Sequence, residues 1–237
     1  MENTMWGKLW TALTACLWLA FAALPASALE GGRGRFIQTG QQSLPPIGWV
    51  DFCQRTERVT DRACEVQGAS VPYIADSPEN YRLVSSVQHH FHTRYAPVED
   101  VGEHWDYLRE GPNGGGDCED FVLSKRRELL RQGKPSSVLL IAVVEAWNPK
   151  KRILEKHAIL VERTSNGDLV LDNMRPDVHW WWESKHRFLY IQSQVHPMVW
   201  LEVVEPTPLE TATVAPAPVP AKRPDKGWQQ KVFQPNN

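Results

Sequence analysis

Seven residues near the middle of the chain, Gly114-Gly115-Gly116-Asp117-Cys118-Glu119-Asp120, organise the rest of the sequence. Asp117 is a favourable helix N-cap, Asp120 follows three positions later as a capping-box-like acid, and a helix is predicted over residues 118–132. Cys118 would then lie in the first turn. Backbone N–H groups and the positive end of the helix dipole are expected to lower its pKa and make the thiol nucleophilic. The alternative is a small hydrophobic residue buried at a helix start.

The length and charge of the chain limit the classes of function. Its 237 residues suffice for one domain with a substantial core. The formal net charge is -2 at pH 7, so no basic excess points to nucleic acid as a partner.

The first 28 residues have the pattern of a secretory signal peptide. Lys8 precedes an apolar run over residues 9–24, and Ala26-Ser27-Ala28 fits a processing site. We therefore predict a signal peptide over residues 1–28 and a mature protein that is periplasmic or secreted and does not span the membrane. A retained membrane anchor and lipidation at Cys16 are the alternatives.

Removal of the signal peptide leaves three cysteines in an oxidising compartment. Cys53 and Cys64 are close in sequence and are predicted to form a structural disulfide, which leaves Cys118 as an unpaired and reactive thiol. Alternatively the pair stays reduced or one member only fills the core.

Composition divides the mature chain into three parts. Residues 29–48 are rich in glycine and polar residues and are predicted to form an extended arm, and residues 49–204 are predicted to form the folded domain. Seven of the 18 prolines lie in residues 205–237, so this tail is predicted to be disordered.

The domain shows signals for both helices and strands, which indicates an α+β fold. Ser77-Pro78-Glu79 is typical of a helix start and precedes apolar residues at helical spacing. Strands are predicted over residues 137–147, 157–162, 169–171, 188–192 and 199–204.

A thiol nucleophile needs a base, and the base needs an orienting acceptor. His157 opens a predicted strand and Asp172 closes the next one. A two-residue turn at Asn166-Gly167 would pair Val161 with Asp172, and His157 would then share a face with Asp172. This register separates the two side chains by about four residues, roughly 13 Å, along the strands, so a different loop or a bulge must shift the pairing if they touch. Asp177 and Asn173 are alternative orienting groups.

Three motifs resemble a known family, the bacterial transglutaminase-like cysteine peptidases, over roughly residues 49–204. They are Gly116-Asp117-Cys118-Glu119-Asp120-Phe121, His157-Ala158-Ile159-Leu160 and Val170-Leu171-Asp172-Asn173. The resemblance, closest to a sister branch of the LapG-like periplasmic proteases, implies a papain-like, transglutaminase-like α+β fold. In that fold the nucleophile lies at a helix N-terminus packed on an antiparallel sheet.

The resemblance also implies roles for individual residues. Cys118 would be the nucleophile, His157 the general base and acid, and Asp172 the residue that orients the histidine. LapG-like members are calcium dependent, and the acids that flank their nucleophile bind the ion, which implies Asp117 and Glu119 as calcium ligands. These members cleave a large surface adhesin, which implies a protein substrate and an inner-membrane regulator. Carboxylate oxygens are suitable ligands for this ion.

Three functions therefore remain open at the level of sequence. The first is a periplasmic cysteine endopeptidase, and the second is a transglutaminase-like acyltransferase that releases the acyl-enzyme with an amine. The third is a catalytically inactive binding module of the cell envelope. The Trp180-Trp181-Trp182 run is predicted to pack in the core or form a lid, and a peptide-binding groove is the alternative.

Overall fold

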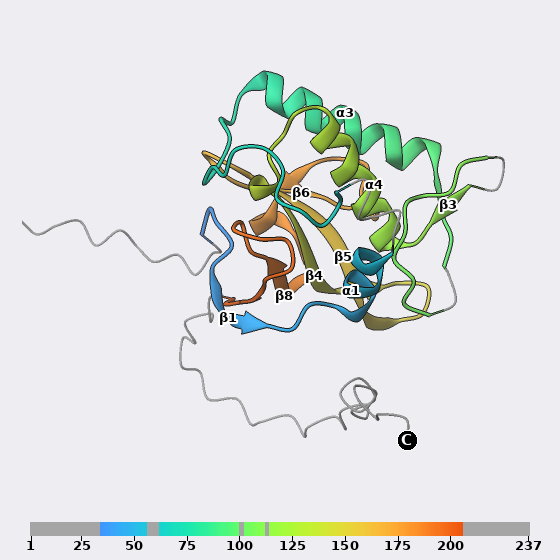
Figure 1. Ribbon diagram of the computed structural model, residues 1–237. Helices are drawn as coiled ribbons and strands as arrows, with labels where there is room; N and C mark the ends of the chain where they lie inside the picture. The colour runs from blue at the N-terminus through green and yellow to red at the C-terminus, as the bar shows by residue number, and fades with distance from the viewer. Residues whose placement is uncertain (1–33, 56–61, 100–101, 112–113, 206–237) are drawn as a thin grey trace, which may run out of the picture.

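The computed structural model describes residues 34–55, 62–99, 102–111 and 114–205 (Figure 1). The predicted signal peptide, with Cys16, and residues 206–237 of the predicted tail lie outside these ranges. No helix within the described ranges is long and apolar enough to cross a membrane.

A seven-stranded antiparallel sheet forms the centre of the domain, in the order β1-β9-β8-β4-β5-β6-β7. The middle strand, β4, is almost continuously apolar, because both faces of the sheet are covered. The strands are β1 (Thr39–Ser43), β4 (Leu139–Asn148), β5 (Ile153–Thr164), β6 (Gly167–Leu171), β7 (His179–Trp180), β8 (Arg187–Gln192) and β9 (Trp200–Val203).

In the part of the chain that the structure describes, three α-helices accompany the sheet, which confirms the predicted α+β class. The helix α3 begins as predicted, with the Ser77 side chain accepting a hydrogen bond from the Asn80 N–H at 3.1 Å. The described helices are α1 (Ile47–Gln54), α3 (Pro78–Arg94) and α4 (Cys118–Arg131), with 3₁₀ turns at Ser136–Val138 and Trp181–Glu183 and a short parallel pair of β2 (Ala96–Pro97) and β3 (Gly115–Gly116).

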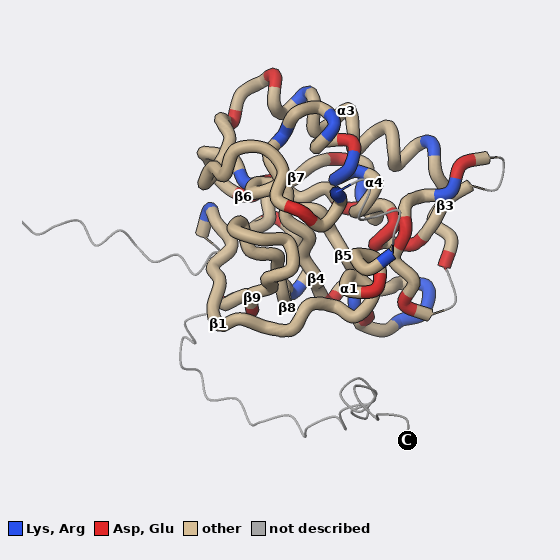
Figure 2. Tube along the Cα trace, viewed as in Figure 1, with Lys and Arg blue, Asp and Glu red and all other residues tan. Residues whose placement is uncertain are grey.

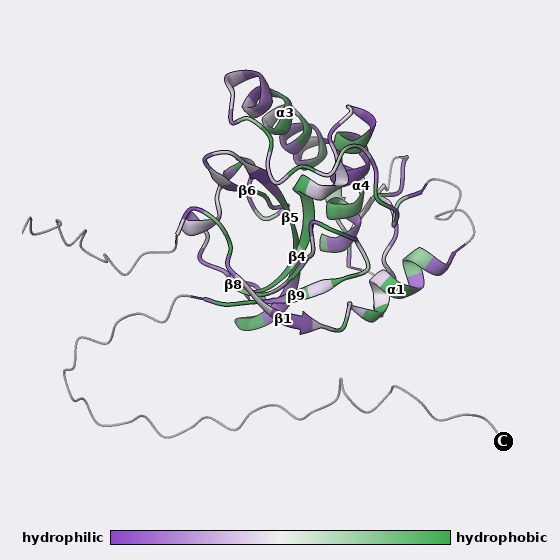
Figure 3. Ribbon diagram, turned by 60° about the vertical axis from the view of Figure 1, so that its left-hand side comes forward, coloured by the Kyte–Doolittle hydropathy of each residue, from purple (hydrophilic) through white to green (hydrophobic). Residues whose placement is uncertain are grey.

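Alternate residues of the sheet enter two separate cores. Along β4, Ile141 joins the core under α3 and α4, whereas Ala142 joins the core on the other face. Figure 3 shows apolar residues along β4 and β5 next to these two helices. Trp181 and Phe188 pack edge to face in the second core, with ring centroids 5.5 Å apart. The middle tryptophan of the run is therefore a core residue, as the prediction of core packing expects.

The segment predicted as an arm contributes to the sheet. Within residues 29–48, β1 pairs with the last strand, β9, through pairs such as Gln42 with Leu201. The sheet therefore starts ahead of the expected boundary at residue 49. The helix α1 was not anticipated, because it has only eight residues and Pro46 at its N-cap position offers no side-chain capping bond.

The predicted disulfide between Cys53 and Cys64 is present. It connects the end of α1 to the segment that carries Ala63, whose carbonyl accepts a hydrogen bond from Arg126 of α4 at 2.8 Å. The disulfide therefore joins α1 to the region against which α4 packs. Acidic and basic residues are interspersed along the chain, in keeping with the small net charge (Figure 2).

Candidate active site

The helix that carries the thiol begins at Cys118 with Asp117 at its N-cap position. The predicted capping pattern is wrong in detail: the Asp117 side chain makes no capping bond, and Asp120 Oδ1 accepts the N–H of Asp106 at 2.8 Å. A Cβ at Gly116 would lie 2.1 Å from Asp120 Oδ2. The glycine two residues before Cys118 is therefore needed so that Asp120 can fold back against β3.

The Cys118 thiol is held between two neighbours. It donates to Glu119 Oε2 at 3.0 Å and accepts the Ala158 N–H at 3.4 Å. Burial and the nearby Glu119 carboxylate raise the pKa of Cys118 well above its usual range. The expected lowering of this pKa by the helix N-terminus is therefore wrong for this state, because desolvation and a neighbouring negative charge outweigh the helix dipole.

His157 and Asp172 are in direct contact. His157 Nε2 lies 2.8 Å from Asp172 Oδ1, and the carboxylate is completely buried. The predicted hairpin register is wrong, because Thr164 pairs with Gly167 and the pairing continues to Leu160 with Leu171. Asp172 directly follows β6. The offset between Asp172 and His157 along the paired strands is therefore two residues instead of the predicted four, which brings their side chains into hydrogen-bond range.

Asp172 has a second histidine partner that sequence analysis missed. His186, from the segment before β8, places Nε2 2.9 Å from Asp172 Oδ2, and the Met174 N–H donates to Oδ1 at 2.9 Å. Burial would raise the pKa of Asp172, but the hydrogen bonds from His157 and His186 outweigh it and hold the pKa well below its usual range. Asp172 is therefore an anion that both histidines stabilise.

The alternative orienting residues are engaged elsewhere or unpaired: the side-chain oxygen of Asn173 is buried without a hydrogen-bond partner. Asp177 is exposed and pairs with Arg175, with Oδ2 2.6 Å from Nη2. Asp172 is thus the acidic residue that the fold brings to His157.

The tautomer of His157 follows from its partner. Because Asp172 is an acceptor, the neutral form of His157 that fits this contact carries its proton on Nε2 and has its lone pair on Nδ1. Cys118 reaches this region through the backbone of Ala158, the next residue along β5, but its thiol proton points to Glu119. The arrangement places a thiol and an imidazole on adjacent elements, and proton transfer between them would require the thiol to turn away from Glu119.

A buried lysine lies on the same helix as the nucleophile. Lys125 is completely buried, and Nζ lies 5.7 Å from the ring centroid of Phe121. Burial lowers the pKa of Lys125 to about 7, against the opposing attraction of Asp172. A lysine in an amphipathic helix is expected on the exposed face, so the sequence gave no sign that the Lys125 ammonium would be buried.

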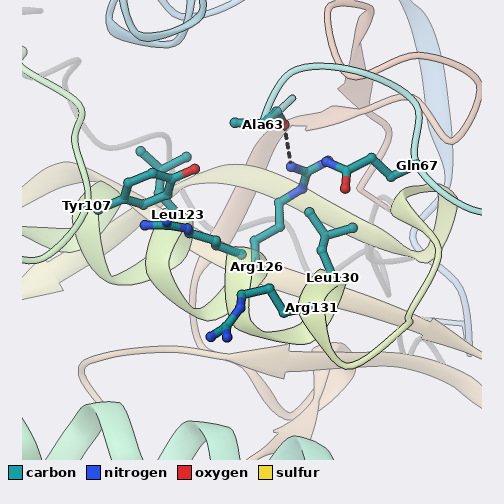
Figure 4. A pocket seen from close by; sticks show the side chains of 8 residues that line it. Ala63, Gln67, Tyr107, Leu123, Arg126, Leu130 and Arg131 are labelled. Carbon is teal, nitrogen blue, oxygen red and sulfur yellow. Dashed lines mark hydrogen bonds between the residues drawn. The ribbon is translucent and has the colours of Figure 1, made fainter. Parts of the chain in front are cut away.

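A hollow of about 200 Å³ lies elsewhere on α4 (Figure 4). Arg126 spans it and donates to the Ala63 carbonyl. None of the predicted catalytic or calcium-binding residues contributes to its lining, which consists of Ala63, Gln67, Tyr107, Leu123, Arg126, Arg127, Leu130 and Arg131.

Comparisons with known proteins place this chain in a family. The sequence profile of the bacterial transglutaminase-like cysteine proteinases (BTLCP) matches residues 39–207. Among solved structures, calcium-bound LapG of Legionella pneumophila is similar at 21% identity and a TM-score of 0.42, covering 54% of this chain and 71% of that one.

The EGTA-treated form of the same protein is similar at 22% identity and a TM-score of 0.40, with 54% and 69% covered. A search of curated proteins gave no match. The family match spans more than half of the chain and confirms the resemblance in the motifs. The chain therefore belongs to the bacterial transglutaminase-like cysteine proteinases and is a cysteine peptidase with their α+β fold.

Proposed function

We propose that the protein is a cysteine endopeptidase in which Cys118, His157 and Asp172 form the catalytic triad. The observation that carries the proposal is the 2.8 Å hydrogen bond between His157 and Asp172 beside the helix that begins at Cys118. It leaves the Nδ1 lone pair of the histidine available as a base on the strand whose next backbone N–H contacts the thiol.

The reaction follows from these positions. Nδ1 of His157 takes the Cys118 proton, and the thiolate attacks the carbonyl carbon of the scissile peptide. The Cys118 N–H donates to the developing oxyanion. His157 then returns the proton to the departing amine, and water cleaves the thioester in a second step with His157 as the base. The Asp172 anion stabilises the imidazolium form that exists between these proton transfers.

Calcium is proposed as a resident ion held by Asp117 and Glu119, the residues on either side of the nucleophile. Their carboxylates are the hard oxygen donors that this ion prefers, and Glu119 already lies at the thiol, 3.0 Å from Sγ. When bound, the ion would supply positive charge next to the start of α4. Chelation followed by calcium readdition tests this assignment through thermal stability of the wild type and of Asp117→Asn.

The proposed location is the periplasm or the extracellular space, after removal of residues 1–28. The Cys53–Cys64 disulfide supports an oxidising compartment. The substrate is proposed to be a cell-surface or envelope protein such as a biofilm adhesin, with an inner-membrane protein as regulator. Detection of the mature protein in a periplasmic extract, with Leu29 at its N-terminus, tests the location.

The triad is tested by thiol labelling of the purified mature protein with iodoacetamide at one pH near 7. We expect Cys118 to label at least tenfold more slowly in His157→Gln than in the wild type, because the base is lost. His89→Gln, which changes an exposed histidine of α3, is the matched control and should label like the wild type. Equal rates in all three proteins would contradict the triad.

Hydrolysis is tested with an unfolded protein such as casein as substrate, in the presence of an added primary amine. An endopeptidase creates new N-termini, which mass spectrometry detects. Amide products carrying the added amine would instead identify an acyltransferase. Cys118→Ala is the control for both products.

A further inference from the structure

Outside the proposed calcium ligands, the residues around Asp172 form a compact set of metal-binding groups. One ligand atom from each of His157, Asp172 and His186 lies within 4.8 Å of the others. These residues come from β5, the chain after β6 and the chain before β8, so the fold itself assembles the set. We name them the His-Asp-His cluster.

The ligand chemistry of the His-Asp-His cluster selects a particular class of ion. Two imidazole nitrogens and one carboxylate oxygen suit Zn²⁺ and Co²⁺, which prefer nitrogen donors. Calcium takes six to eight oxygen ligands and does not fit this set. We propose that the cluster is a binding site for a divalent transition metal ion such as Zn²⁺, with water completing its coordination.

The surroundings of the cluster resemble the support that metal ligands require. The Met174 N–H donates to Asp172 Oδ1 at 2.9 Å, and Gln88 of α3 donates to the Asp172 carbonyl at 2.6 Å. Such contacts fix the orientation of a ligand before the ion arrives. The rings of His157 and His186 lie at 63°, with centroids 5.8 Å apart, so they approach the carboxylate from different directions.

The ion also has a route of entry. The side chain of His186 is 15% exposed, whereas that of Asp172 is fully buried. His186 therefore forms the side of the cluster that faces solvent. The ion would bind to His186 first and then to the buried carboxylate of Asp172.

Metal binding changes the tautomer of both histidines. Without an ion, Nε2–H of each ring donates to Asp172. An ion bound by Nε2 replaces that hydrogen, and each ring remains neutral by carrying its proton on Nδ1 instead. His157 then has no lone pair on Nδ1. The ion would therefore inhibit the proposed triad, and this inhibitory part rests on the proposed function whereas binding itself does not.

Binding is tested by calorimetric titration of the mature wild-type protein with Zn²⁺, in buffer that contains calcium, and by the visible absorption of Co²⁺. We expect one ion per chain and an affinity at least tenfold weaker in His186→Gln, a substitution that keeps an N–H donor for Asp172. His89→Gln should bind like the wild type. Matching melting temperatures exclude misfolding. Unchanged affinity in a folded His186→Gln, or no binding to the wild type, overturns the proposal.

Cys118→Ser separates the cluster from a thiolate site. If the ion binds at the cluster, this variant keeps the wild-type affinity. The Co²⁺ spectrum of the wild type should then contain no cobalt–thiolate charge-transfer band. Loss of binding would assign the ion to the thiol and overturn the proposal. Zn²⁺ should slow iodoacetamide labelling at least tenfold in the wild type and much less in His186→Gln. Binding at the cluster together with an unreactive Cys118 in every protein would refute the proposed triad but leave the metal site.

Discussion

The Sγ atom of Cys118 lies 3.0 Å from Oε2 of Glu119, the next residue in the chain. A carboxylate that accepts the thiol proton stabilises the protonated form, and its negative charge opposes formation of the thiolate. The contact with Glu119 therefore favours the thiol form of Cys118 over the thiolate.

Replacement of Glu119 should make the thiol more reactive when calcium is absent. Glu119→Gln removes the charge that contributes to the raised pKa of Cys118, so that pKa falls and the thiolate fraction at a given pH rises. We expect faster iodoacetamide labelling than in the wild type at about pH 7 in the presence of a chelator. Glu128→Gln, at the other end of α4, is the control and should leave the rate unchanged. A slower rate in Glu119→Gln would show that the carboxylate assists the thiol.

Loss of the Asp172 charge should weaken His157 as a base, even when the replacement side chain has the same shape as aspartate. Asp172→Asn removes the anion that stabilises protonated His157, and we expect Cys118 labelling to slow by roughly tenfold or more. Asp177→Asn removes an exposed acid that pairs with Arg175 and should have no effect. The labelling rates of the two variants, measured side by side, decide which acid orients the base.

Lys125 should make stability depend on pH. Its pKa is about 7 in the folded protein and near 10.5 when unfolded, so between these values the unfolded chain holds a proton that the folded chain lacks. Stability should therefore rise with pH across this window, and below pH 7 the full cost of burying the charge is present. Each pKa unit corresponds to about 1.4 kcal/mol.

Lys125→Met removes this cost. We expect its free energy of unfolding at about pH 6 to exceed that of the wild type by about 2–4 kcal/mol, with the difference shrinking towards pH 10. Denaturant titrations at several pH values measure it. Lys185→Met, at an exposed position, should show no such trend. A difference independent of pH would mean that Lys125 has the same charge in both states.

The disulfide should stabilise the domain without contributing to the chemistry. Its two cysteines are 11 residues apart, and loop closure of that size is worth about 2–3 kcal/mol. Replacement of Cys53 and Cys64 by alanine should lower the free energy of unfolding by about that amount while Cys118 labels at the wild-type rate. Reductant should reproduce the loss in the wild type and have no further effect on the double variant.

The sequence predicted which residues approach one another but not how closely. Strand periodicity placed His157 and Asp172 on one face of the sheet. This holds in both the predicted and the observed register, because the two registers differ by an even number of residues. The turn was misplaced because Gly167 was assigned to it, whereas it pairs with Thr164 as the first residue of β6. A Cβ at Gly167 would lie 2.7 Å from the Arg35 carbonyl oxygen and 2.8 Å from the Trp182 ring. The glycine therefore allows close packing that no local pattern reveals.

Other parts of the site depend on the tertiary structure alone. His186 follows Lys185 in a polar stretch without any motif, and only the fold brings it to Asp172. The pKa of Cys118 depends on burial and on the rotamer of Glu119, neither of which can be read from spacing. Local signals sufficed for α3 and α4, whose N-cap positions and apolar spacing agree with each other.

The pairing of β1 with β9 has a consequence for biosynthesis. Among the described residues, β1 pairs in the sheet with β9 alone, so this strand cannot pair before Trp200–Val203 have been synthesised. A nascent chain that lacks β9 leaves one edge of the sheet without its two outer strands, β9 and β1. Completion of the sheet is thus postponed until the strands on both sides of the domain's chain exist together, and β1 stays unpaired during most of the synthesis of the domain.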